Sequence, residues 1–375
     1  MKIPPRCINY CKAGVFHLKR YQRWRSAFAA VAATAGTAFA SGREVVLFFA
    51  QMGNAAWAGI AFASALYGVL CALVYHFALQ TGAESFAGIY MRVLDPKQGM
   101  VVSGVHGLLM AMTVGVMLVS CGEMAALALP LRHAFWIGVL FSAAVALLLN
   151  LKGMRVLPEA GLLVLVACGG FYIALALDAR PVSIYANYQT AAELSGSVTA
   201  ALMLAALHAA LNASVSGGIA ARFASDALSP SAFGARCGLV MLLFLAVANA
   251  AMVRGGEKLL SQMLPTVVLA ARWGTAGYYI SIIVTWLCAV TTLAASLGAI
   301  VGQLDDGVKN RRALCAVLLC AALAAGLMGL QRFVEVGYAV LGWACVFSLA
   351  GLACYYDWHQ VLRLLRRGGR HKISC

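Results

Sequence analysis

Charged residues are scarce in this chain, and that scarcity indicates its class. Only 11% of its 375 residues are Asp, Glu, Lys or Arg, whereas 63% are hydrophobic. A soluble domain carries roughly twice that share of charge. Apolar runs of about 20 residues, each long enough to cross a bilayer, recur along the whole sequence. The composition excludes a soluble globular protein, and the continuous runs exclude the alternating pattern of a membrane β-barrel. We predict an all-α polytopic membrane protein.

Motifs of enzyme chemistry are also missing. The sequence has no His-Glu-x-x-His metal site, no phosphate-binding loop with its lysine and no nucleophile elbow. Most of the 12 cysteines fall within apolar runs, where a free thiol behaves as a small apolar group. We therefore expect no enzyme, no resident cofactor and no disulfide framework. The net charge of +15 lies mostly in tails and loops, so it does not indicate binding of nucleic acid.

Ten of the apolar runs are expected to span the membrane. They cover residues 27–51, 55–79, 99–126, 134–151, 159–178, 195–221, 232–253, 278–302, 312–330 and 335–356. The apolar stretch from Thr266 to Val301 is too long for one upright helix, and Arg272-Trp273-Gly274 divides it. Residues 266–274 are therefore expected to form an interfacial helix before the eighth span.

The basic residues divide unequally between the two sides of this arrangement. Of the 28 Lys and Arg residues, 21 fall in the two tails and the even-numbered loops, and one, Arg43, falls within a span. Because cytoplasmic loops carry the excess of positive charge, both termini are expected to be cytoplasmic. The basic tails, residues 1–26 and 357–375, are expected to meet anionic lipid headgroups.

Ten spans divide into two halves of five, residues 27–178 and 195–356, joined by an external loop over 179–194. An odd number of helices in each half means that the second half enters the membrane from the opposite face, as in an inverted repeat. Each half also begins with a helix rich in small and polar residues near its middle, at Gly36 to Gly42 and at Leu207 to Gly218. Paired interruptions of this kind indicate a binding site where the repeats meet. We predict that the first and sixth helices are both interrupted.

Several short motifs resemble those of the YkvI-like membrane proteins of bacteria, in the same order along residues 27–356. The most specific is the Gly-x-x-Phe-Ala-Ser-Gly-x-Glu run at 36–44, followed by Phe48-Phe49. Weaker ones are Val119 to Glu123, Val156 to Pro158, Leu211-Asn212, Leu264-Pro265 and Thr291-Thr292. That family is placed in the amino acid–polyamine–organocation superfamily. The resemblance implies a LeuT-like fold of five plus five helices in the bacterial inner membrane, without implying a substrate.

The resemblance implies a sodium site between the first and eighth helices. Its ligands would be the backbone carbonyls of Gly36, Phe39 and Cys288 and the hydroxyls of Thr291 and Thr292. Oxygen ligands suit hard cations, and an unwound segment frees carbonyls to serve. The alternative for the two threonines is that their hydroxyls bond back to their own helix.

The resemblance also implies a substrate pocket, formed by Ala38, Ala40, Ser41, Gly42 and Arg43 and facing His208 and Asn212. Free N–H groups and the positive end of the downstream half-helix favour a carboxylate there.

Arg43 departs from the family, in which a neutral glutamine is usual at this position. It could bind an anionic substrate, replace a bound cation by its fixed charge, or pair with Glu123 and tie two helices together. Formal charge at this depth costs several kcal/mol unless it is paired or hydrated, which marks the site as functional. Glu44 and Glu123 are further candidates, because a buried carboxyl can take up a coupling proton.

These observations favour a secondary transporter of a small organic solute, amino-acid-like or carboxylate-bearing, that works by alternating access and is coupled to sodium or protons. The main alternative is a membrane sensor or receptor subunit with the same fold and pocket that signals instead of transporting. A third is a structural partner in a membrane complex.

Overall fold

The computed structural model describes residues 24–151, 157–178, 197–224, 228–255, 259, 262, 264–304, 315–320, 323–324 and 340–355. Seven helices in these ranges are long and apolar enough to cross a membrane. They are α4 (Ala55–Thr81), α6 (Pro96–Ala128), α7 (Ala134–Leu151), α8 (Leu157–Leu177), α9 (Val198–Arg222), α10 (Pro230–Val253) and α13 (Gly274–Leu304). Each overlaps a predicted span, and a shorter apolar helix over 340–355 overlaps the tenth. The predicted ninth span, 312–330, lies largely outside the described residues. The chain is a multi-pass membrane protein.

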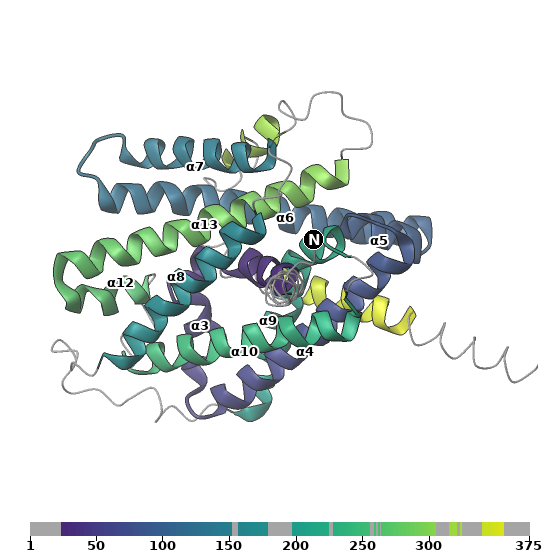
Figure 1. Cartoon of the computed structure of the whole chain (residues 1–375), viewed down its shortest axis with the longest axis horizontal. Helices are drawn as coiled ribbons and strands as arrows, with labels where there is room; N and C mark the ends of the chain where they lie inside the picture. Colours follow the sequence, from purple (N-terminus) through teal and green to yellow (C-terminus); the bar gives the residue numbers. More distant parts are fainter. Residues whose placement is uncertain are drawn as a thin grey trace, which may run out of the picture.

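Six of the seven long helices form two groups with the first segment between them, and α8 contacts both groups (Figure 1). In one group α4 packs along both α9 and α10, and in the other α6 packs along α7 and α13. The purple first segment lies between the groups, and its short helices contact α13 on one side and α9 and α10 on the other. This arrangement places the predicted interruption at the centre of the molecule.

The ends of several helices follow from local sequence. Gly82 ends α4 in the left-handed conformation, with a φ of 62°, and its N–H donates to the carbonyl of Ala78. Ser229 caps α10 by accepting a hydrogen bond from the N–H of Ala232 at 3.3 Å, and Pro230 takes the first helical position. Glycine is favoured just after the C-terminus of a helix, and Ser followed by Pro is favoured at the N-terminus.

Two short helices lie between consecutive long ones. α5 (Phe86–Val93) follows α4 and is capped by Ser85, whose hydroxyl accepts from the N–H of Gly88 at 3.0 Å. α12 (Pro265–Ala270) and the 3₁₀ turn η4 (Ala271–Trp273) precede α13. The latter pair matches the separate helix predicted at 266–274, and Gly274 marks the division with a φ of 74°. α5 was not predicted, because its eight residues are too short to produce an apolar run.

The sixth membrane helix is continuous, which corrects one prediction. α9 runs without a break through residues 209–214, where an interruption was expected. Two polar side chains bond back to their own helix: the Asn212 amide donates to the carbonyl of His208 at 3.0 Å, and the Ser216 hydroxyl donates to that of Ala213 at 3.3 Å. The glycines here serve close packing. A Cβ at residue 217 would lie 3.1 Å from the ring of Phe86.

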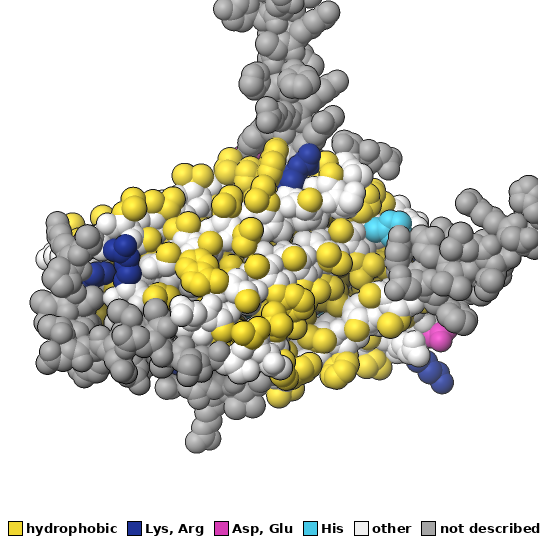
Figure 2. Space-filling view, turned by 90° about the horizontal axis from the view of Figure 1, so that it is seen from below, with side chains coloured by type: hydrophobic (Ala, Val, Ile, Leu, Met, Phe, Trp, Pro, Cys, Tyr) yellow, Lys and Arg dark blue, Asp and Glu magenta, His cyan; other side chains and the backbone are white. Residues whose placement is uncertain are grey.

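The outer surface is apolar, as the lack of charge requires. Figure 2 shows a face covered mostly by hydrophobic side chains, with Lys, Arg and Asp or Glu near its edges. Large exposed apolar side chains occur on several helices, among them Leu140, Val166 and Phe347. Such surface is stable only in contact with lipid or another apolar partner.

Candidate functional site

The first membrane segment is broken into short pieces. A helix over residues 24–34 is followed by α2 (Thr37–Ala40), α3 (Arg43–Phe48) and the 3₁₀ turn η1 (Ala50–Met52). The interruption predicted in the first helix is confirmed. Breaks of this kind leave backbone groups without partners in their own helix, and these groups must find other partners inside the protein.

Gly42 forms the turn between α2 and α3, and no other residue fits there without strain. Its φ is 82°, a conformation that side-chain-bearing residues rarely adopt. A Cβ atom at this position would also lie 2.5 Å from the sulfur of Met252 in α10. The glycine therefore allows both the reversal of the chain and its close approach to α10.

Thr266, the second residue of α12, binds the carbonyls that the turn exposes. Its backbone N–H donates to the carbonyl of Ser41 at 2.9 Å, and its hydroxyl donates to that of Ala40 at 3.3 Å. Thr266 is fully buried. The short helix before α13 is thereby fixed to the broken first segment.

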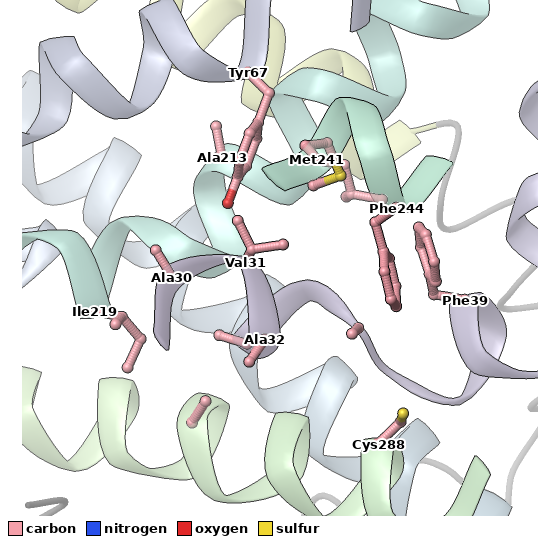
Figure 3. Close-up of a cluster of buried hydrophobic side chains, with 14 of the residues drawn as sticks. Ala30, Val31, Ala32, Phe39, Tyr67, Ala213, Ile219, Met241, Phe244 and Cys288 are labelled. Carbon is pink, nitrogen blue, oxygen red and sulfur yellow. The ribbon is translucent and has the colours of Figure 1, made fainter. Parts of the chain in front are cut away.

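The carbonyl of Phe39, also at the turn, is bound by two further hydrogen bonds. This oxygen accepts hydrogen bonds from the Tyr172 hydroxyl of α8 and, at 2.9 Å, from the N–H of Gly42. The Phe39 ring stacks on Phe244 of α10, with ring centroids 4.9 Å apart (Figure 3). The break is therefore held by α8, α10 and α12 together.

A buried carboxylate lies next to the break. Glu44, in the first turn of α3, is only 6% exposed. Its Oε1 atom accepts a hydrogen bond from the Asn212 side-chain amide at 3.0 Å and lies 3.2 Å from Nε2 of His208. Both partners are on α9, one helical turn apart. An acid, an imidazole and an amide thus meet in the middle of the membrane segment, where each is costly unless it is partnered.

Aromatic rings enclose the imidazole of His208. Phe48 and Phe49 approach it edge-on, with ring centroids 5.4 and 5.0 Å away. The side chain is 1% exposed, and its Nδ1 atom has no hydrogen-bond partner in the described part of the chain. The Glu44 carboxylate is therefore the polar group that faces this imidazole.

A cavity of about 30 Å³ adjoins this cluster. Glu44, Asn212 and Thr292 are among its lining residues, as are Thr34 and Thr113. Thr292 is 3% exposed, and its hydroxyl has no hydrogen-bond partner within the described ranges. A volume of this size accommodates a water molecule or a small ion, not an organic solute.

The residues expected to hold sodium are only partly brought together. Gly36 and Thr292 both line the cavity. The Thr291 hydroxyl donates to the Leu287 carbonyl of its own helix at 2.8 Å, which is the alternative considered from the sequence. The carbonyl of Phe39 carries the two hydrogen bonds already described, and Cys288 is fully buried in α13.

The residues expected to hold substrate lie around the turn. Ala40, Ser41 and Gly42 are buried there, and the side chain of Ala38 lies outside the described residues. His208 and Asn212 face Glu44, as given above.

Arg43 is directed towards the loop before α12, where its Nη1 atom donates to the carbonyl of Gln262 at 3.4 Å. Glu123, which was considered as its partner, is exposed near the C-terminal end of α6.

Comparisons with known proteins follow the geometry. No protein-family model matches the chain, and no curated protein matches it in sequence. Among solved structures, it is similar to the manganese transporter of Eremococcus coleocola in complex with an aromatic bis-isothiourea substituted compound. The TM-score is 0.59 and the identity 12%, covering 89% of this chain and 76% of that one. Two single-residue mutants of the same transporter give TM-scores of 0.56 and 0.54 at 13% and 14% identity, each covering 90% of this chain and 77% of the other.

The chain has the fold of these manganese transporters. This is a LeuT-type fold, which the resemblance carried by the motif at residues 36–44 implied. At 12% identity the likeness concerns the fold alone. The resemblance to the YkvI-like family stays a prediction.

Proposed function

We propose that this protein is a secondary transporter that moves a small organic solute across the bacterial inner membrane by alternating access, with ten helices in two inverted halves. The observation that carries the proposal is the broken first segment with a buried acid, imidazole and amide beside it. A transporter must hold a solute at the membrane midplane by groups that the lipid cannot supply, and a broken helix with adjacent polar side chains provides them.

The binding site that we propose is formed by the turn residues 38–43 together with His208 and Asn212. Glu44 is suited to pair with an ammonium group, and the turn offers backbone groups to a carboxylate, so an amino-acid-like solute matches both ends. The cavity of about 30 Å³ is too small for such a solute. We therefore assign this structure to a closed state, from which the two helix groups must separate before the solute enters.

A metal ion is the second candidate substrate, because of the donor set. Glu44, His208 and Asn212 offer a carboxylate oxygen, an imidazole nitrogen and an amide oxygen, ligand types that suit divalent transition metals. The cavity size favours an ion, and the solved structures of this fold include manganese transporters.

Coupling is proposed to run through the same cluster. Glu44 on α3 and His208 on α9 contact each other, so a change in the net charge of this pair would alter the cost of moving α3 relative to α9. The alternative is coupling to a sodium gradient, with the ion bound in the cavity beside Thr292.

The test begins with ligands. The purified chain is heated with single L-amino acids, dicarboxylates or Mn²⁺, in sodium and in potassium at equal ionic strength. A ligand present at a hundred times its dissociation constant stabilises the folded state by about 2.7 kcal/mol. We expect one of these three classes of ligand to raise the melting temperature of the native chain, and we expect Glu44→Gln to abolish that rise. The exposed acid on α6 provides the matched control, Glu123→Gln, which should keep it.

Three outcomes distinguish sodium coupling, proton coupling and a sensor or receptor function. A rise that grows in sodium and is lost in Thr292→Val, but not in Thr291→Val, supports sodium coupling. A rise that is indifferent to sodium, together with uptake into proteoliposomes driven by a pH gradient, supports proton coupling. Ligand binding without uptake under any gradient would contradict transport and favour the sensor or receptor function.

A further inference from the structure

Asp178 joins the two helix groups at the end of α8 that is predicted to be external. It follows the last residue of α8, and its N–H donates to the carbonyl of Ala174 at 3.1 Å. Its own carbonyl accepts a hydrogen bond from Nη1 of Arg254, the residue after α10, at 3.1 Å. Its carboxylate oxygen Oδ2 accepts one from the indole N–H of Trp273, in η4, at 2.8 Å. Because α10 belongs to one group and η4 packs on α13 of the other, a single residue is bonded to both.

The short segment formed by α12 and η4 is held at both of its ends. Thr266, near its start, is bonded to the turn of the first segment, as described above. Trp273, at its end, is bonded to Asp178, and its ring meets that of Phe171 edge-on, with centroids 6.0 Å apart. In Figure 1 α12 and one end each of α8 and α10 lie on the left side of the molecule. Because the whole segment is only six residues of α12 and three of η4, a displacement of its start away from the turn also strains the bond at its end.

The opposite end of α8 is bonded to a different part of the chain. Glu159, in the first turn of α8, lies 2.6 Å from Nη2 of Arg25 in the helix over residues 24–34. Each end of α8 therefore has its own bond to a neighbouring element, and a substitution at one end can be compared with a substitution at the other.

We propose that Asp178 is a latch: its hydrogen bonds to Trp273 and Arg254 hold the segment of α12 and η4 in the closed position, and they break before this segment moves away from the turn. The inference rests on the proposed function only in assigning that movement to the entry of a solute. The bond to Trp273 is partly buried and the bond to Arg254 is exposed, so water can replace both partners when the helix groups separate. Hydrogen bonds that exchange with water add only modest stability, which makes the latch reversible.

The experiment is hydrogen–deuterium exchange of the purified full-length chain, measured by mass spectrometry without ligand. Amides of a helix exchange when the helix opens locally, so their rate reports how often the segment is displaced. Asp178→Ala and Trp273→Phe each remove the bond between the two side chains, whereas Asp178→Asn keeps an oxygen that can accept it. Glu123→Ala is the matched control, because Glu123 is an exposed acid on α6. Heating curves check that each variant folds.

We expect exchange over residues 264–274 to become about fivefold faster in Asp178→Ala and in Trp273→Phe, a factor that corresponds to about 1 kcal/mol. The double variant should exchange no faster than either single one, because both substitutions remove the same bond. Asp178→Asn and Glu123→Ala should exchange at close to the native rate.

Unchanged exchange over residues 264–274 in both Asp178→Ala and Trp273→Phe would overturn the proposal. So would an equal increase in α6 and α7, because the substitutions would then loosen the whole fold. Glu159→Gln, at the other end of α8, should leave residues 264–274 unchanged, and faster exchange there would show that the effect does not belong to Asp178. Because the measurement uses no ligand, its failure would leave the proposed transport intact, and a failure of uptake would leave the latch intact.

Discussion

Replacing Gly234 by alanine is expected to force α10 away from α4. A Cβ atom at residue 234 would lie 2.3 Å from the carbonyl oxygen of Gly68 and 2.6 Å from the Cβ atom of Ala72. Neither neighbour can rotate aside, because one is backbone and the other is fixed to it. Overpacking of a core costs about 1–3 kcal/mol, and this geometry belongs at the upper end. Alanine also has a higher helix propensity than glycine, which offsets roughly 1 kcal/mol of this cost. The free energy of unfolding should therefore fall by about 2 kcal/mol.

The assay is the melting temperature of the purified protein in one detergent, followed by size-exclusion chromatography after heating. Gly170→Ala in α8 is the matched control, since nothing lies within 4 Å of a Cβ placed there. The control should melt at or above the temperature of the native chain, and Gly234→Ala several degrees below it. If Gly234→Ala melted at the same temperature as the native chain, the close contact between α4 and α10 would be refuted.

Three further substitutions test the region around the break. Tyr172→Phe removes a hydrogen bond to the buried carbonyl of Phe39 and should lower the free energy of unfolding by about 1 kcal/mol, as measured by denaturant or heat. Thr292→Val removes a buried hydroxyl that has no partner in the described ranges, so in sodium-free buffer it should raise stability by up to about 1 kcal/mol; a loss would show that the hydroxyl is satisfied. Trp273→Phe deletes the hydrogen bond from its indole N–H to Asp178 at 2.8 Å and should cost about 1 kcal/mol, with a larger effect contradicting its position at the partly exposed outer surface.

The architecture was largely predictable because lipid leaves the backbone few choices. A spanning segment must satisfy its own hydrogen bonds, so composition and length predict the helices. The break at Gly36 to Gly42 was also predictable, since small residues accumulate there beside two charges. The same logic failed for residues 209–214 of α9. Small residues both loosen a helix and let helices approach closely, and sequence alone does not separate the two effects.

The candidate site was predictable only in part. Glu44, His208 and Asn212 were all identified, but their convergence on one carboxylate oxygen depends on how α3 packs against α9. Tyr172 and Thr266 were missed, because each acts through a hydrogen bond to a carbonyl far away in the chain. A buried tyrosine in an apolar run and a threonine after proline are the only signals that sequence offers for them.

The two hydrogen bonds from Thr266 connect access to the site with its chemistry. They join the start of α12, on the side predicted to be external, to the carbonyls of Ala40 and Ser41 at the turn. Any displacement of α12 away from the turn must break these two hydrogen bonds. The same step leaves two carbonyl oxygens free to accept other hydrogen bonds or to bind an ion. In the proposed transporter, a gate at α12 and the polar lining of the site could therefore not be set independently. A solute that entered from this side would meet a turn whose oxygens had just been released, and closure of α12 would withdraw them again.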